Sequence, residues 1–210
     1  MKTSIKNLFA AALTLVVLSS SAFATTTKEN NITVLNQVKN ISKIEVKGNV
    51  EVILVQAPTE SVKVYDSYYA KNALVQQQDG VLRISSFEKE TLTVSVYVRN
   101  LSSIEASDNS SIKTSGKINF VSLDVILKDK ATADLNTSTI NLYTSVKDNA
   151  SLRLSGSTTE HYAVLGSQAK LSMDQFAAIS TSVNTIAPIY AKVATVTAPT
   201  LDTLFISEEF

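Results

Sequence analysis

The sequence contains no cysteine, one histidine and only five glycines among its 210 residues. Without cysteine the protein has neither disulfides nor thiolate metal sites, and it lacks the residue that carries a lipoprotein anchor. The single histidine, His161, would make a poor transition-metal site without a second imidazole nearby. Five glycines are also too few for the Gly-Gly-x-Gly-x-Asp repeats that bind calcium. We therefore expect no metal site and no cofactor.

The charges are balanced, with 19 Lys and Arg against 19 Asp and Glu. This balance offers no electrostatic basis for binding nucleic acid or an anionic membrane surface. The three arginines, Arg83, Arg99 and Arg153, are spread along the chain, and there is no Gly-x-Ser-x-Gly nucleophile elbow. These features favour a protein that is not an enzyme.

The longest apolar run lies at the amino terminus, from Leu8 to Leu18. It follows Lys2 and Lys6 and ends before small residues at 22 and 24, which is the pattern of a secretory signal peptide. The run is too short to span about 30 Å of hydrocarbon as a helix. We expect a signal peptide at 1–24, a linker at 25–40 and a single domain at 41–210, exported to the periplasm, cell surface or medium. A retained membrane anchor is the alternative.

From residue 41 onward, apolar and polar residues alternate with a period of two, which is typical of β-strands. The segments 43–47 and 50–54 are separated by Lys47-Gly48-Asn49, and this spacing predicts a hairpin with Gly48 in its turn. Further strands are expected around residues 62–64, 82–84 and 92–98. Helical periodicity is nearly absent. The sequence therefore predicts an all-β protein.

A short repeat occupies the second half of the chain. Ala131, Ala150 and Ala169 are 19 residues apart, and each follows a similar polar turn. Apolar residues two apart come after each turn, including Leu135, Leu154 and Met173 in equivalent places. A unit this short cannot bury its apolar face alone, but stacked units bury a continuous core. The repeat predicts a parallel β-helix, or β-solenoid, of about 19–21-residue coils with an N-terminal β-hairpin region. The spacing predicts a bulge or altered coil near 176–186, and an antiparallel β-sandwich is the alternative fold.

Three motifs carry a resemblance to a known family: Gly48 to Gln56, Asp79 to Ile84, and the repeated turns of the Asp-Asn-Ala-Ser-Leu type. They are similar to the putative auto-transporter adhesin, head GIN domain family of Bacteroidetes envelope proteins. The resemblance implies a parallel β-helical stack outside the inner membrane, with adhesion as its role and no defined catalytic residue. The glycine that the family places at each turn is replaced here by Asn109, Lys130, Asn149 or Gln168, which predicts that the turn geometry varies.

The resemblance leaves three functional classes open. The first is a non-enzymatic envelope module that binds an unidentified cell-surface glycan or protein. The second is a self-associating scaffold protein, and the third is a polysaccharide-degrading enzyme, because parallel β-helices also carry such activities. No nucleic acid partner and no transmembrane segment after signal cleavage are expected.

Two sets of residues are candidates for chemistry or binding. Asp108, Asp129 and Asp148 repeat at the turns and could hold calcium, but aspartates that bond to the backbone of their own turns are the favoured interpretation. His161 falls in an apolar column and is interpreted as a core or rim residue. The candidate ligand contacts are tyrosines, which could form a sugar-stacking platform or cap the end of the stack: Tyr65, Tyr68 and Tyr69.

Overall fold

The computed structural model describes residues 32–65 and 73–186. The predicted signal peptide at 1–24 lies outside these residues, as do Tyr68 and Tyr69. Residues 32–35, within the segment predicted as a linker, form the first strand. Every regular element of the described residues is a β-strand, which confirms the all-β prediction.

The strands are short in the N-terminal part of the chain and long at its C-terminal end. In chain order they are β1 (Ile32–Leu35), β2 (Lys43–Gly48), β3 (Val50–Gln56), β4 (Ser61–Tyr65), β5 (Ala73–Gln78), β6 (Val81–Ser86), β7 (Leu92–Val98), β8 (Ser103–Ala106), β9 (Ser111–Thr114), β10 (Ile118–Asn119), β11 (Ser122–Leu127), β12 (Thr132–Val146), β13 (Ser151–Gly166) and β14 (Lys170–Ile186).

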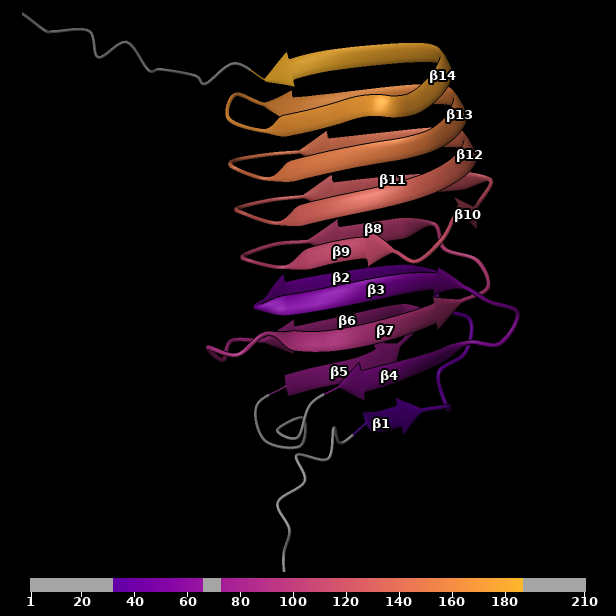
Figure 1. Ribbon diagram of the computed structural model, residues 1–210, viewed down its shortest axis with the longest axis vertical. Helices are drawn as coiled ribbons and strands as arrows, with labels where there is room; N and C mark the ends of the chain where they lie inside the picture. The colour runs from indigo at the N-terminus through magenta and orange to yellow at the C-terminus, as the bar shows by residue number, and fades with distance from the viewer. Residues whose placement is uncertain (1–31, 66–72, 187–210) are drawn as a thin grey trace, which may run out of the picture.

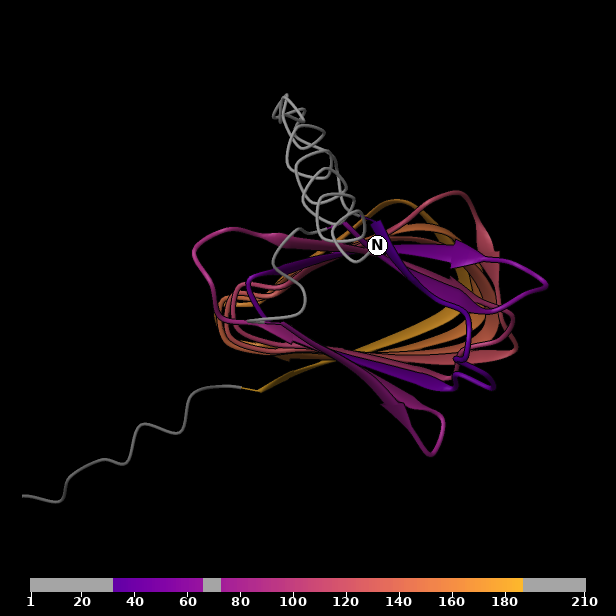
Figure 2. The ribbon, with the colours of Figure 1, turned by 90° about the horizontal axis from the view of Figure 1, so that it is seen from below.

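These strands form one 14-stranded sheet that is curled on itself, as Figures 1 and 2 show. From β1 the order passes through β4, β7, β3 and β9 to β12, and then returns through β11, β8, β2 and β6 to β5. β12 belongs to both sides, because its residues 132–134 pair with β9 and its residues 141–146 pair with β11. β13 and β14 continue the sheet beyond β12. The two sides face each other across the core.

The predicted fold class, a parallel β-helix or solenoid with an N-terminal β-hairpin region, is wrong. The sheet is mixed: β4 lies antiparallel to both β1 and β7, and β5 lies antiparallel to β6. The remaining pairs are parallel, for example β2 with β6 and β3 with β7. The prediction treated residues 41–210 as one solenoid domain, although the repeat occupies only the second half of the chain. Period-two alternation does not distinguish parallel from antiparallel neighbours, so the pattern could not reveal this mixture.

The predicted hairpin at Gly48 is also absent, because β2 and β3 do not pair with each other. β2 pairs with β6 and β8, whereas β3 pairs with β7 and β9 on the opposite side. Gly48 has a φ of +81°, and a Cβ atom there would lie 2.0 Å from the backbone oxygen of Ser86. Glycine is needed at this position because the chain changes sides through a tight, left-handed turn.

The 19-residue spacing is the pairing register of the long strands. Residues 132–146 of β12 lie beside residues 151–165 of β13, with Leu135 opposite Leu154. The irregularity predicted near 176–186 lies elsewhere: the register shifts between Arg153 and Ser155 of β13, where β14 passes from Ser172 to Gln175. Beyond this bulge the spacing is 20 residues, so His161 lies opposite Thr181.

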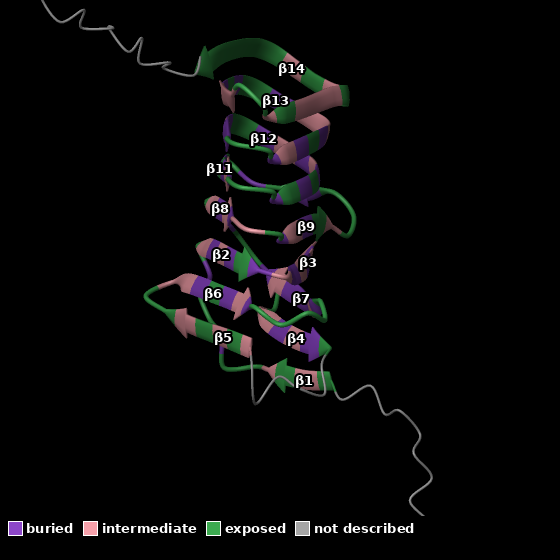
Figure 3. Ribbon diagram, turned by 90° about the vertical axis from the view of Figure 1, so that its left-hand side faces the viewer, coloured by how far each residue is buried: buried purple, intermediate pink, exposed green. Residues whose placement is uncertain are grey.

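The core runs along the interior of the curled sheet, as the burial colours of Figure 3 show. It is built from Val, Ile and Leu at alternate positions of the strands, including Val52, Leu82, Ile104, Leu123 and Leu154. Burial decreases toward the C-terminal end, and no residue of β14 is fully buried. Because β8, β11, β12, β13 and β14 pair in parallel and nearly in register, their outward side chains form columns with one residue from each strand.

Candidate functional site

The tyrosines predicted as ligand contacts are not brought together within the described residues. Tyr65 ends β4 and is 38% exposed, beside Thr93 in the antiparallel register with β7. Tyr68 and Tyr69 lie outside the described residues. Whether this cluster binds a ligand or covers the end of the sheet therefore stays a prediction.

A different pair of tyrosines forms the most distinctive surface feature. Tyr143 of β12 and Tyr162 of β13 lie opposite each other in the parallel register. Their rings are stacked, with centroids 5.8 Å apart and planes inclined by 12°. These two tyrosines were not among the predicted site residues, although they are 19 residues apart, which is the repeat spacing of the alanines and leucines. That spacing was the signal that could have found them.

The tyrosine pair sits within a column of four outward residues, Asp124, Tyr143, Tyr162 and Ser182, contributed by β11 to β14. A second column runs beside it and consists of polar residues: Ser122, Asn141, Glu160 and Ser180. Together the two columns line an open hollow of about 440 Å³. We call this the tyrosine hollow.

The rings leave one face each for a ligand. Because Tyr143 and Tyr162 cover one face of each other, the outer face of Tyr143 is turned toward Asp124 and that of Tyr162 toward Ser182. Both neighbours have shorter side chains than tyrosine, and Tyr162 is 43% exposed. The Asn184 amide nitrogen donates a hydrogen bond to the Tyr162 hydroxyl and orients that ring. The hollow therefore offers an oriented aromatic surface beside hydroxyl, amide and carboxylate groups.

His161 lies next to Tyr162 in the chain but points into the core, as predicted. It is 3% exposed, and its Nε2 lies 3.0 Å from the Thr144 hydroxyl oxygen. The Phe176 ring meets it edge-on at 5.8 Å, and its Nδ1 has no hydrogen-bond partner among the described residues. Burial lowers the pKa of His161 below its ordinary value of 6.5, because a charged imidazole would lose its hydration. The imidazole is therefore neutral at pH 7.

The turn aspartates bind backbone, but this backbone belongs to a neighbouring turn and not, as the favoured interpretation expected, to the aspartate's own turn. Each carboxylate accepts a hydrogen bond from the turn of the neighbouring strand pair: Asp108 from the Gly48 amide at 3.0 Å, Asp129 from the Asp108 amide at 3.1 Å, and Asp148 from the Asp129 amide at 3.2 Å. We call these three residues the aspartate ladder. Within residues 32–65 and 73–186, no three His, Cys, Asp or Glu residues are grouped to hold a metal ion.

The same aspartates provide the left-handed positions of the turns. Asp108, Asp129 and Asp148 have φ values of 60°, 58° and 54°. In each of these turns the left-handed residue directly precedes the position at which the family resemblance places a glycine, Asn109, Lys130 or Asn149. Aspartate tolerates the left-handed conformation better than most residues, because its short side chain can bond locally.

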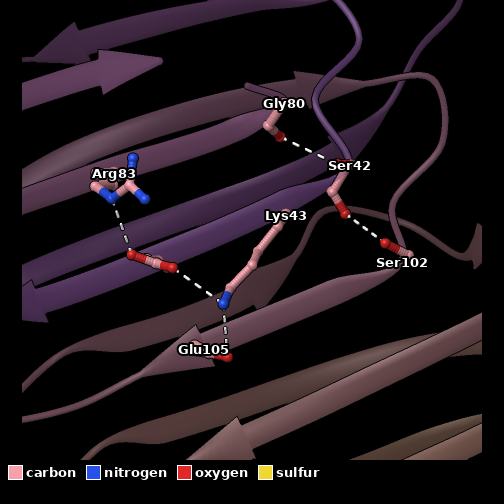
Figure 4. Close-up of polar contacts among 7 residues, drawn as sticks. Ser42, Lys43, Gly80, Arg83, Ser102 and Glu105 are labelled. Carbon is pink, nitrogen blue, oxygen red and sulfur yellow. Dashed lines mark hydrogen bonds and ion pairs between the residues drawn. The ribbon is translucent and has the colours of Figure 1, made fainter. Parts of the chain in front are cut away.

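An ion-pair network lies on the side of the sheet that includes β11 and the tyrosine hollow, further along the strand order toward β6 (Figure 4). The Lys43 ammonium contacts Glu105 at 2.7 Å and Glu45 at 3.0 Å, and Arg83 contacts Glu45 at 3.2 Å. The Glu105 and Glu45 carboxylates raise the pKa of Lys43, and Lys43 lowers that of Glu45. Backbone contacts flank the network, since Ser42 accepts from the Ser102 hydroxyl at 2.8 Å. Two bases thus neutralise two acids.

Comparison with known proteins places the chain in a family. Residues 40–208 match the family described as "Putative auto-transporter adhesin, head GIN domain". The chain belongs to this family. The resemblance inferred from the sequence motifs is thereby confirmed. None of the curated proteins matches the sequence.

Solved structures from Bacteroidetes-type sources share the fold of this head GIN domain protein. A putative adhesin from Bacteroides fragilis superposes with a TM-score of 0.65 at 12% identity, covering 75% of this chain and 76% of that one. A putative adhesin from Parabacteroides merdae gives a TM-score of 0.57 at 14% identity, covering 74% and 77%. A protein named as a putative lipid binding protein from Parabacteroides distasonis gives 0.58 at 9% identity, covering 74% and 78%. At these identities the similarity concerns the fold alone.

No helix capable of crossing a membrane occurs in the part of the chain that the structure describes.

Proposed function

We propose that this head GIN domain protein is a non-enzymatic adhesion module of the cell envelope that binds glycans in the tyrosine hollow. Residues 1–24 act as its export signal in this proposal, and 41–210 form one domain. The observation that carries it is the oriented Tyr143–Tyr162 pair beside a column of serine, asparagine and glutamate side chains. The family's name supports the adhesive role.

The chemistry of the hollow suits a sugar ring. A pyranose presents C–H groups on its faces and hydroxyl groups around its edge, so it packs against an aromatic ring while bonding to polar neighbours. In the hollow, the free face of Tyr162 supplies the packing surface, and Ser180 and Glu160 supply polar groups beside it. The hollow is open rather than enclosed, which suits a segment of a longer chain.

The absence of enzymatic activity is part of the proposal. The two carboxylates of the hollow, Asp124 and Glu160, come from different columns and from strands that are not adjacent, since β12 separates β11 from β13. His161 points away into the core, and no described side chain of the hollow is a nucleophile held against a base. The hollow is therefore arranged for binding.

The test is a binding measurement on a glycan array, with the mature protein as probe. Tyr162→Ala should weaken binding to the captured glycans about tenfold or more, because it removes a stacking face worth roughly 1.4 kcal/mol. Tyr162→Phe keeps the face and loses only the hydroxyl that Asn184 contacts, so it should bind within about threefold of the wild type. Circular dichroism of each variant checks the fold.

A matched control uses a tyrosine on the opposite side of the sheet. Tyr97 of β7 lies under the Lys63 ammonium, 5.0 Å from the ring centroid, and is far from β13 in the strand order. Tyr97→Ala should leave glycan binding unchanged. Equal binding by Tyr162→Ala and the wild type would refute the assignment of the site. A triple alanine variant at Tyr65, Tyr68 and Tyr69 tests, on the same array, the ligand contacts proposed from the sequence.

A further inference from the structure

The tyrosine hollow has an uneven charge. Of the residues that line it, only Asp124 and Glu160 carry a charge at neutral pH, and both are exposed carboxylates. His161 adds no positive charge, because it is buried and neutral. No lysine or arginine lines the hollow among the residues that the structure describes. A ligand that enters the hollow therefore meets negative charge alone.

The nearest bases in the register are held by other acids. Lys43 lies in the same column as Asp124, separated from it by Ser103 of β8. Its ammonium is held between Glu45 and Glu105, as Figure 4 shows for the latter. Neither Asp124 nor Glu160 forms an ion pair with a described residue. The two carboxylates thus keep their full charge toward the hollow.

Carboxylates accept hydrogen bonds but cannot donate them. Sugar hydroxyls are suitable donors, and the amide of Asn141 and the hydroxyls of Ser180 and Ser182 can both donate and accept. A uronic acid or another anionic sugar would instead place its own negative charge close to Asp124 or Glu160. One such pair at about 4 Å lowers the affinity about fivefold in a water-exposed site.

We propose that the tyrosine hollow selects uncharged glycans and that Asp124 and Glu160 exclude acidic ones. This inference rests on the proposed glycan-binding function and names the class of sugar that the site accepts. Tyr143 and Tyr162 supply attraction to any pyranose face, whereas the two carboxylates supply the discrimination.

The experiment compares pairs of polysaccharides that differ only at their carboxyl groups, which are charged in one member and reduced to hydroxymethyl groups in the other. Polygalacturonate, alginate and hyaluronan are each immobilised beside their carboxyl-reduced forms, in which the uronic acids have become neutral hexoses. The mature protein is titrated over them at low salt. We expect the reduced forms to bind at least about fivefold more tightly than their parents. A double variant, Asp124→Asn with Glu160→Gln, should bring each pair within about threefold, since it removes both charges without changing the shape of the side chains.

The control variant is Asp134→Asn, which removes an exposed carboxylate from β12 on the opposite side of the sheet. It should retain the preference of the wild type for reduced polysaccharides. If the acidic parent polysaccharides bind as tightly as their reduced forms or more tightly, and Tyr162→Ala abolishes that binding, the proposed charge selection is refuted but the glycan-binding function is not. Failure of all six polysaccharides and of the glycan array to bind would refute the function and the selection together.

Discussion

The aspartate ladder makes a sharp prediction at its middle member, Asp129. Its carboxylate accepts a hydrogen bond from the Asp108 amide at 3.1 Å, and its own amide donates to the Asp148 carboxylate at 3.2 Å. Its φ of 58° lies in the left-handed region. Substitution of this residue therefore changes two separable quantities, the accepted hydrogen bond and the strain of the backbone.

Three substitutions separate the two contributions. Asp129→Asn keeps an acceptor oxygen and a residue that tolerates positive φ, so the free energy of unfolding should fall by less than about 0.5 kcal/mol. Asp129→Gly loses the acceptor but no strain is added, which predicts a loss of about 1 kcal/mol. Asp129→Ala loses the acceptor and also places a Cβ-bearing residue at positive φ, which predicts a loss of about 2 to 3 kcal/mol.

The measurement is urea unfolding of the protein, followed by circular dichroism, with thermal unfolding as a second probe. The alanine variant should lower the melting temperature by about 4 to 10 °C for a domain of this size. If the glycine and alanine variants are equally unstable, backbone strain has no part in the choice of aspartate. If all three variants match the wild type, the ladder contributes nothing to stability and the reasoning fails.

Three further predictions concern stability. Gly156→Ala should lower the free energy of unfolding by several kcal/mol, because its Cβ would lie 2.1 Å from the backbone oxygen of Thr137 on the neighbouring strand. The Cβ of Gly116→Ala meets no atom within 4 Å, so this variant adds only left-handed backbone strain of about 1 to 2 kcal/mol. Chemical denaturation compares the two variants. Leu154→Asn should lower the free energy of unfolding by about 3 kcal/mol or more, because Leu154 is 1% exposed. Arg153→Asn, on the exposed face of the same strand, should change it by less than about 0.5 kcal/mol. Equal stability of the two variants would contradict the alternation of buried and exposed residues along β13. Burial lowers the pKa of His161, so the folded protein binds fewer protons at this residue than the unfolded chain does. The stability that the neutral imidazole contributes is therefore lost as the pH falls below about 6.5. Melting temperatures at pH 7.5 and 5.5 should differ less for His161→Gln than for the wild type.

The failure of the fold prediction has a physical cause that the N-terminal strands show. The residues of β2 and β3 alternate in the same way as those of a hairpin, yet the two strands lie on opposite sides of the curled sheet. Their partners come from residues 30 or more positions away, such as Arg83 for Glu45 and Val94 for Val52. The alternation of apolar and polar residues shows which face of a strand is buried, but it does not show which strand lies beside it.

The candidate site shows the same division. The repeat spacing of 19 residues was visible in the sequence, and it is the spacing that stacks Tyr143 on Tyr162. What the sequence could not show is that these rings face outward beside Glu160 and Asn141. The columns form only after parallel pairing has aligned the strands.

By itself, the sequence determined the all-β class, the family, the burial of His161 and the backbone role of the turn aspartates, because each of these follows from local alternation, spacing or motif. Only the tertiary structure decided the mixed pairing, the side on which each strand lies and the tyrosine hollow. These features depend on contacts between residues distant in the chain, and the free energy of such contacts is settled by packing across the whole sheet rather than by any local pattern.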